Sequence, residues 1–297
     1  MKSQSAMEYL MTYGWAILVI AVVLAALYSL GIFNPNTFAP NTFAPKASAG
    51  SCEVVRPFGP GTTTDISLEG TCTNMLPKYV ASFNGGNSYI QPRQGVLGGT
   101  SSLTVSLWFD AKSLVSNGNQ YGWIDQESRW GFKFGQPASV SFCFATPTAS
   151  WAWCATPNSL YTFSPNKWYF IAFTYKNGTP TEFYSDGIQY PGPTETGTMA
   201  TGLPNPLQIG PAISATNPND ALNGYIANVQ IYNTSLSANQ ITALYQEGIG
   251  GAPIELTHLV GWWPLNGNAN DYSGNKNNGK EYNIGYSSTW YKTYSAP

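Results

Sequence analysis

The stretch LNGYIANVQIYNTSLSANQITALYQEG, residues 222–248, joins two different side-chain periodicities. Its first part, residues 224–233, has the short alternating pattern of a β-strand. Its second part carries an apolar helix stripe with i, i+3, i+4 spacing, formed by Ile241, Leu244 and Tyr245. Ser237 can cap the helix at its start and Gly248 can end it. The stretch therefore predicts a strand followed by one short, late helix.

Further strand patterns lie upstream of this stretch, at residues 103–109, 139–144 and 167–176. The first of them places apolar side chains on one face, namely Leu103, Val105, Leu107 and Phe109. Many short strands with turn residues between them and one helix predict an antiparallel β-sandwich or jelly roll. We assign this mainly β head to residues 51–297.

The composition is typical of a turn-rich β protein exposed outside the cell. Of the 297 residues, 9% are charged and 14% are aromatic, and the net charge is −2. A chain with so little positive charge gives no reason to expect a nucleic acid partner.

The four cysteines are Cys52, Cys72, Cys143 and Cys154, which allow three pairings. Their spacing favours Cys52–Cys72 and Cys143–Cys154, each closing a short loop. Neither pair has zinc-site spacing, and His258 is the only histidine, so metal ligation by these residues is not expected. Two local disulfides indicate an oxidising, extracytoplasmic compartment.

An uncharged apolar run at residues 11–33 is long enough, as a helix of roughly 35 Å, to cross a bilayer core. A secretory signal peptide has a shorter apolar core with a cleavage site after it. A plain membrane anchor explains the length but does not need Glu8 at its edge.

The segment KSQSAMEYLMTYGW, residues 2–15, resembles the class III signal of archaeal type IV pilin-like proteins. That resemblance implies a leader at residues 1–3, cleavage by a prepilin peptidase between Ser3 and Gln4, and a pilin helix at residues 4–33. Ser3 departs from the Gly or Ala that is more usual there.

The same resemblance implies a role for Glu8, the fifth residue after the cut. Its carboxylate would pair with the new amine of Gln4, its own or a neighbour's, because each charge alone is costly near the membrane core. The helix would anchor the subunit in the membrane first and then self-assemble into the core of a helical filament. We expect a surface location, with the head exposed.

A Pro-rich linker is predicted at residues 34–50, where NTFAP occurs twice in tandem, at 36–40 and 41–45. Proline every five residues prevents a helix and favours an extended spacer.

The order of motifs in the head resembles the laminin-G-like, concanavalin-type jelly roll. The motifs are ASFNGGNSYIQ (81–91), SLTVSLWF (102–109), NKWYFIAFTYKNG (166–178), FYSDGIQ (183–189) and the 222–248 stretch. The tail segment 259–279 also resembles this family, where it usually comes first. It is therefore a permuted strand, the start of a truncated second copy, or a strand that pairs with a neighbour. We favour permutation, with residues 259–265 completing the sandwich.

No catalytic residue is predicted, and we expect no enzyme. Asp125 and Glu127 fall on one face of a strand, and we interpret them as surface acids near Arg129. The nucleophile-elbow and triad patterns are absent from the sequence.

No cofactor is expected. Relatives of this fold often hold calcium with carboxylates, but this chain has Asn84 and Asn228 at the corresponding places, which leaves only weak calcium candidates. Asn177 and Asn233 begin sequons and are glycosylation candidates.

An aromatic hairpin surrounds the second cysteine pair. If Cys143 faces Cys154, the aromatic residues of both strands share the opposite face, namely Phe142, Phe144, Trp151 and Trp153. Such a face favours core over a ligand platform.

These features together predict a structural subunit of an archaeal pilus-like filament with an adhesive, lectin-like head for a glycan or cell-surface ligand. The alternatives are a membrane-tethered glycan-binding protein that does not polymerise, and a tethered glycan hydrolase.

Overall fold

The computed structural model describes a defined set of residues. They are 19–21, 52–56, 66–72, 76–93, 99–114, 120–126, 130–135, 139–146, 149–157, 162–199, 206–210 and 221–297. The chain divides into two compact units, Met1–Lys46 and Ala47–Pro297. In the first unit residues 19–21 are helical. The rest of the expected helix, with Ser3, Gln4 and Glu8, and the linker lie outside the described residues.

No helix within the described part of the chain is both long and apolar enough to span a membrane.

The second unit is an antiparallel β-sandwich, as the sequence predicts. Its larger sheet has the order β12 (Ile188–Glu195), β11 (Thr179–Ser185), β10 (Trp168–Lys176), β5 (Ser102–Ala111), β14 (Asn223–Tyr232), β3 (Val80–Asn84) and β17 (Gly285–Ser287), with β15 (Leu259–Trp263) also paired to β14. Its smaller sheet has the order β16 (Lys280–Tyr282), β4 (Tyr89–Gln91), β13 (Gln208–Ile209), β6 (Gln120–Gln126), β7 (Trp130–Gly135), β8 (Ser139–Thr146) and β9 (Ala149–Ala155).

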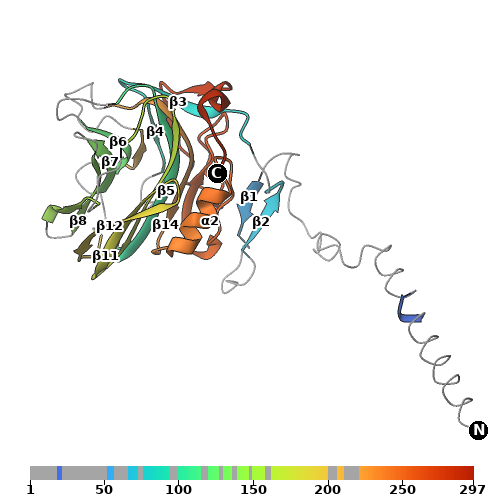
Figure 1. Ribbon diagram of the computed structural model, residues 1–297, viewed down its shortest axis with the longest axis horizontal. Coiled ribbons are helices and arrows are strands. Elements are labelled where there is room, and N and C mark those ends of the chain that lie inside the picture. Colours follow the sequence, from blue (N-terminus) through green and yellow to red (C-terminus); the bar gives the residue numbers. More distant parts are fainter. Residues whose placement is uncertain are drawn as a thin grey trace, which may run out of the picture. The chain divides into compact units, whose positions relative to one another are not determined.

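The larger sheet is buried on both faces (Figure 1). One face packs on the smaller sheet, and β5 contributes Val105, Leu107 and Phe109 to that core. The other face is covered by α2 (Ala238–Gln246) and the C-terminal segment, and there Trp108 joins a second core. The expected apolar face of β5 is confirmed, and because side chains alternate along a strand, the same strand also supplies the second core from its other face.

The late helix α2 begins after the predicted cap Ser237 and ends before the predicted terminating residue Gly248. The Ser237 hydroxyl accepts the backbone N–H of Gln240, whose side chain in turn accepts the N–H of Ser237. Ile241 and Leu244 are buried against the larger sheet. Gly248 follows the helix with a φ of 78°, a left-handed conformation that favours glycine.

Strand β14 is the point where distant parts of the chain meet. One of its edges pairs with β3 along residues 223–226 and then with β15 along residues 229–232. Between them Asn228 has a φ of 49°, and the register with β5 shifts there. The expected strand at 259–265 therefore forms as Leu259–Trp263 inside the sandwich of its own chain.

The remaining C-terminal residues join both sheets, which the sequence does not predict. Strand β16 adds to the smaller sheet and β17 to the larger. Two short 3₁₀ helices also occur, η3 (Leu256–His258) and η4 (Trp290–Thr293), and Trp290 is buried.

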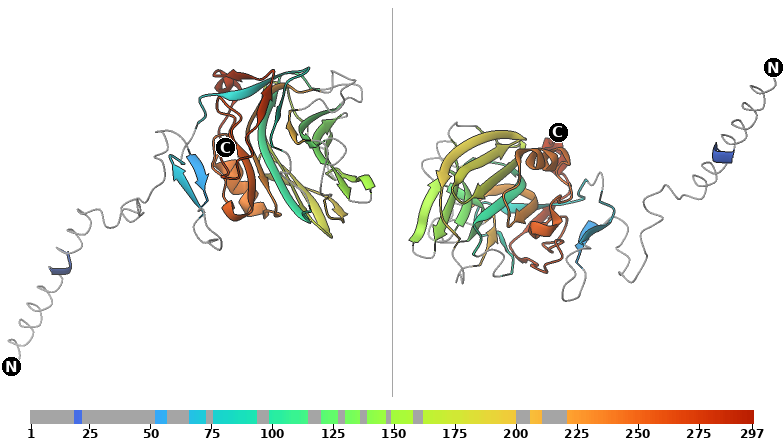
Figure 2. Two further views of the ribbon diagram at one scale, coloured as in Figure 1. Left: turned by 180° about the vertical axis from the view of Figure 1, so that it is seen from behind. Right: turned by 90° about the horizontal axis from the view of Figure 1, so that it is seen from below.

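Near the start of the head, β1 (Cys52–Val55) and β2 (Ser67–Gly70) form a separate two-stranded ribbon. It lies beside the C-terminal segment (Figure 2). The N–H of Val54 donates to the carbonyl of Tyr272, and the ribbon adds Cys52 and Val54 to the second core.

Candidate functional site

The outer face of the smaller sheet, turned away from the sandwich core, carries a continuous row of residues. Strand pairing places them side by side in the order Lys280, Gln91, Gln208, Asp125, Gly131, Cys143 and Cys154. Gln208 lies opposite Gln91 because their neighbours Ile209 and Ile90 are paired antiparallel. Those two isoleucines are fully buried in the core, so the flanking glutamines point the other way.

A pair of stacked tyrosines lies beside the first end of this row. The ring centroids of Tyr89 and Tyr282 are 4.4 Å apart with an interplanar angle of 17°. The ammonium of Lys280 lies 4.9 Å from the centroid of the Tyr282 ring. We call the group Tyr89, Gln91, Gln208, Lys280 and Tyr282 the tyrosine–glutamine face.

The tyrosine–glutamine face is reachable from solvent. Its tyrosines and glutamines are half-buried, and Lys280 is exposed. Among the described residues, the side-chain amides of Gln91 and Gln208 have no hydrogen-bond partner. Two adjacent amides present donors and acceptors to a ligand, while a tyrosine presents a flat apolar ring with a polar tip. This combination suits a ligand with hydroxyl groups at its edges and an apolar face.

An ion pair between Asp125, in the middle of the row, and Lys133 corrects the expectation that Asp125 is a surface acid. Asp125 is not a surface acid: it is 4% exposed, and its Oδ2 lies 3.4 Å from Nζ of Lys133, which is 5% exposed. A Cβ at Gly131 would collide with Cε of Lys133 and with the Asp125 carboxylate, so this glycine makes room for the pair. Glu127 and Arg129 lie outside the described residues.

Both calcium candidates use their amide oxygens in hydrogen bonds within the protein. The amide oxygen of Asn84 accepts hydrogen bonds from the N–H of Gly86 and the hydroxyl of Ser88. That of Asn228 accepts from Trp262 Nε1 and Gln230 Nε2 and is buried. Calcium needs several free, preferably charged, oxygen atoms.

The described parts of the chain contain no group of three or more Asp, Glu, His or Cys side chains that could hold a metal ion.

Both favoured cysteine pairs are joined in the structure. Cys143 and Cys154 are directly opposite on β8 and β9, and Cys52 and Cys72 close the ribbon. Of the aromatic residues in the β8–β9 hairpin, Phe142 lies in the sandwich core. The side chains of Phe144, Trp151 and Trp153 are outside the described set.

Both sequon asparagines are exposed. Asn177 lies in the turn between β10 and β11, where its Oδ1 accepts the N–H of Gly197. Asn233 follows β14, and its own N–H donates to the carbonyl of His258.

Sequence reasoning missed the tyrosine–glutamine face. Tyr89 and Gln91 alternate around a buried isoleucine, and Lys280 and Tyr282 have the same spacing. That alternation was the available signal, but only the pairing of β16 with β4 brings the two segments together.

Comparison with known proteins agrees with this fold. Residues 84–242, more than half of the chain, match the family model described as the concanavalin A-like lectin/glucanases superfamily. A search of curated proteins finds no match.

Solved structures with a similar fold include a candidate carbohydrate-binding protein of Bacteroides ovatus, at 15% identity and a TM-score of 0.57, over 81% of this chain and 70% of that one. Domain 4 of an extracellular arabinanase from Geobacillus stearothermophilus, in complex with arabinotriose, has 17% identity and a TM-score of 0.43, over 55% and 75%. A pentraxin of Limulus polyphemus has 12% identity and a TM-score of 0.43, over 57% and 83%. At these identities the likeness concerns the fold alone.

Proposed function

Because this chain belongs to the concanavalin A-like lectin/glucanases superfamily, we propose that its head binds glycans through the tyrosine–glutamine face. The observation that carries the proposal is the adjacent pair of Gln91 and Gln208 beside the stacked tyrosines, whose side-chain amides have no hydrogen-bond partner among the described residues. Amides suit the hydroxyl groups of a sugar ring, and an aromatic ring suits its apolar face.

We further propose that the head decorates a pilus-like filament built from the N-terminal segment. The support is the sequence pattern in residues 2–15, with Gln4 as first mature residue and Glu8 four positions later. A prepilin peptidase would process the chain, and the subunit would reside in the membrane until it assembles.

Two other functions remain as alternatives. A tethered glycan-binding protein that never polymerises needs the same face but neither Gln4 nor Glu8. A tethered glycan hydrolase needs two carboxyl groups roughly 5–9.5 Å apart across the sugar. Asp125 is buried in an ion pair with Lys133, which favours a binding role over catalysis.

Glycan binding is tested with the full chain in detergent on an array of immobilised glycans. We expect Gln208→Ala and Tyr282→Ala each to weaken binding at least tenfold, which corresponds to about 1.4 kcal/mol. The matched control is Tyr291→Ala, which removes a tyrosine that is 59% exposed on η4, outside the face. Unchanged binding in both face variants would contradict the proposal, and release of reducing ends from a bound glycan would favour the hydrolase.

The filament role is tested by Glu8→Gln in cells that make the protein. We expect a processed, membrane-resident subunit that no longer enters filaments, because the substitution removes the partner of the Gln4 amine. Electron microscopy of filaments is read beside the subunit level in the membrane fraction. Normal filaments from this variant would overturn the proposed assembly role of Glu8.

A further inference from the structure

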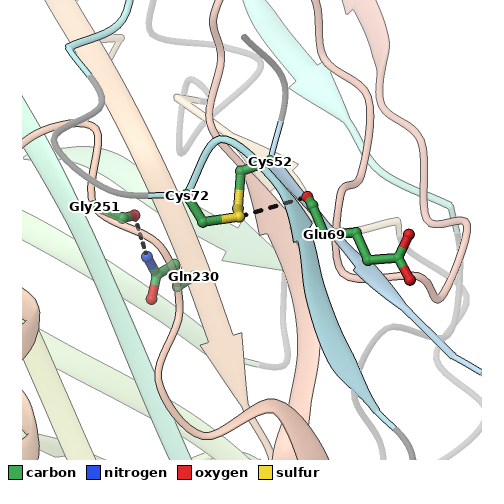
Figure 3. Close-up of a disulfide and its surroundings, with 5 residues drawn as sticks. All are labelled: Cys52, Glu69, Cys72, Gln230 and Gly251. Atoms are coloured by element: carbon green, nitrogen blue, oxygen red, sulfur yellow. Dashed lines mark hydrogen bonds between the residues drawn. A yellow bond between two sulfur atoms is a disulfide. The ribbon is translucent and has the colours of Figure 1, made fainter. Parts of the chain in front are cut away.

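Tension that enters the head from its N-terminal side reaches Cys52 first and then has two routes. One runs along β1 and β2 through the ribbon. The other crosses the disulfide to Cys72, which is 20 positions further along the chain. Figure 3 shows this disulfide, with the carbonyl oxygen of Glu69 on β2 3.5 Å from the sulfur of Cys72.

The route through the ribbon depends on weak, non-covalent contacts. Cys52 pairs with Gly70, so tension between Cys52 and Cys72 would open the hairpin from its end, one residue pair at a time. Outside the hairpin, Val54 packs in the second core and contributes one backbone hydrogen bond to the C-terminal segment. Arg56 adds hydrogen bonds to three carbonyls, those of Leu256, Leu259 and Ser273.

The route through the disulfide leads directly into the larger sheet. Shortly after Cys72, the carbonyl of Pro77 accepts a hydrogen bond from buried Trp290, and the N–H of Tyr79 donates to Asn266. Strand β3 begins at Val80 and is paired on one side with β14 and on the other with β17.

We propose that Cys52–Cys72 is a mechanical bypass: it carries tension from the residues before Cys52 to β3, so that the ribbon bears little of the load. The source of the tension, a tethered head bound to a ligand, rests on the proposed function. The bypass itself is a property of the head and can be measured without ligand or filament.

The experiment pulls single full-length chains in detergent micelles in optical tweezers, with handles at both termini. In Cys52→Ala/Cys72→Ala we expect an extra low-force step before the main unfolding of the head. Its length would be about 65 Å, from roughly 3.3–3.6 Å per residue of the freed loop. Wild type and the matched control Cys143→Ala/Cys154→Ala should lack this step. The proposal is wrong if residues 52–72 of the double variant extend in the same step in which the two sheets unfold.

A second measurement does not require the double variant to fold. In Cys143→Ala/Cys154→Ala, Cys52–Cys72 is the remaining disulfide. Held at constant force with a thiol reductant, the folded head should lengthen by the same step, at a rate that rises with force. A reduction rate independent of force would show that this bond carries no load and would overturn the proposal.

Discussion

The hydroxyl of Thr293 donates a hydrogen bond of 2.6 Å to Oδ2 of Asp110, which is 1% exposed on β5. This bond joins the last turn of the chain to the centre of the larger sheet. Burial raises the pKa of Asp110, while the hydrogen bonds from Thr293 and the backbone of Lys167 and the charge of Lys112 act in the opposite direction. Oδ1 of the same carboxylate has no hydrogen-bond partner within the described part of the chain.

Asp110→Asn should therefore stabilise the head near neutral pH. A folded-state pKa above the ordinary value means that the stability from Asp110 is fully present below about pH 3.8 and is lost as pH rises through the folded pKa. Asparagine keeps an oxygen for Thr293 without the charge. We expect the melting temperature of the variant to exceed that of wild type by a few degrees near pH 7 and by much less near pH 3.

The control for this comparison is Glu247→Gln, which removes a carboxylate exposed beyond the end of α2. It should change the melting temperature little at either pH. A constant difference between Asp110→Asn and wild type across the range would contradict the linkage.

The C-terminal segment is expected to be essential for folding. Deleting all residues after Gly251 removes several buried side chains, and the largest apolar ones among them include Trp262, Trp263, Leu265 and Trp290. Each contributes roughly 1.5–3 kcal/mol by burial, and together they rival the whole stability of a typical domain. The truncated chain should show no cooperative melting by circular dichroism, whereas removal of exposed residues 295–297 should leave the transition in place.

Gln230 holds a buried polar network on β14. Its Nε2 donates to Asn228 Oδ1 and the carbonyl of Gly251, and its Oε1 accepts the Tyr232 hydroxyl at 2.6 Å. Gln230→Met keeps the volume but removes the acceptor of the buried Tyr232 O–H, at a cost of about 1–3 kcal/mol in the free energy of unfolding. Denaturant titration measures it, with exposed Gln246→Met as control. Equal losses in the two variants would argue against the network.

Processing is expected between Ser3 and Gln4. This register alone puts Glu8 beside the new amine, as the pilin-like pattern requires. Intact mass and N-terminal sequencing of protein from its native surface should give a chain that starts at Gln4. A native chain that starts at Met1 would refute the processing proposal.

The parts of the fold that the sequence predicts are those with local causes. The helix α2 follows from a cap at Ser237, an apolar stripe and a terminating glycine within twelve residues. The strand at Leu259–Trp263 follows from two adjacent tryptophans that require burial.

The features that could not be predicted from the sequence depend on pairing between strands, including strands that lie far apart in the chain. Tyr89 and Tyr282 stack only because β16, near the end of the chain, pairs with β4 near the start of the head. The burial of Asp125 likewise depends on its ion pair with Lys133 on the next strand, with Gly131 between them. Neither pairing can be read from the periodicity of the sequence. Periodicity shows which side chains of a strand share a face, but it does not show which strand lies beside it.

The shared edge of β14 sets the order in which the head can be completed. Strand β3, near the head's beginning, and β15, close to its end, must both reach that edge, and β17 must then cover β3. Contacts of such large sequence separation form late, because loop closure precedes any gain from pairing. A ribosome that stalls before it has translated Leu259–Trp263 therefore leaves a chain whose larger sheet lacks the strand that completes the edge of β14.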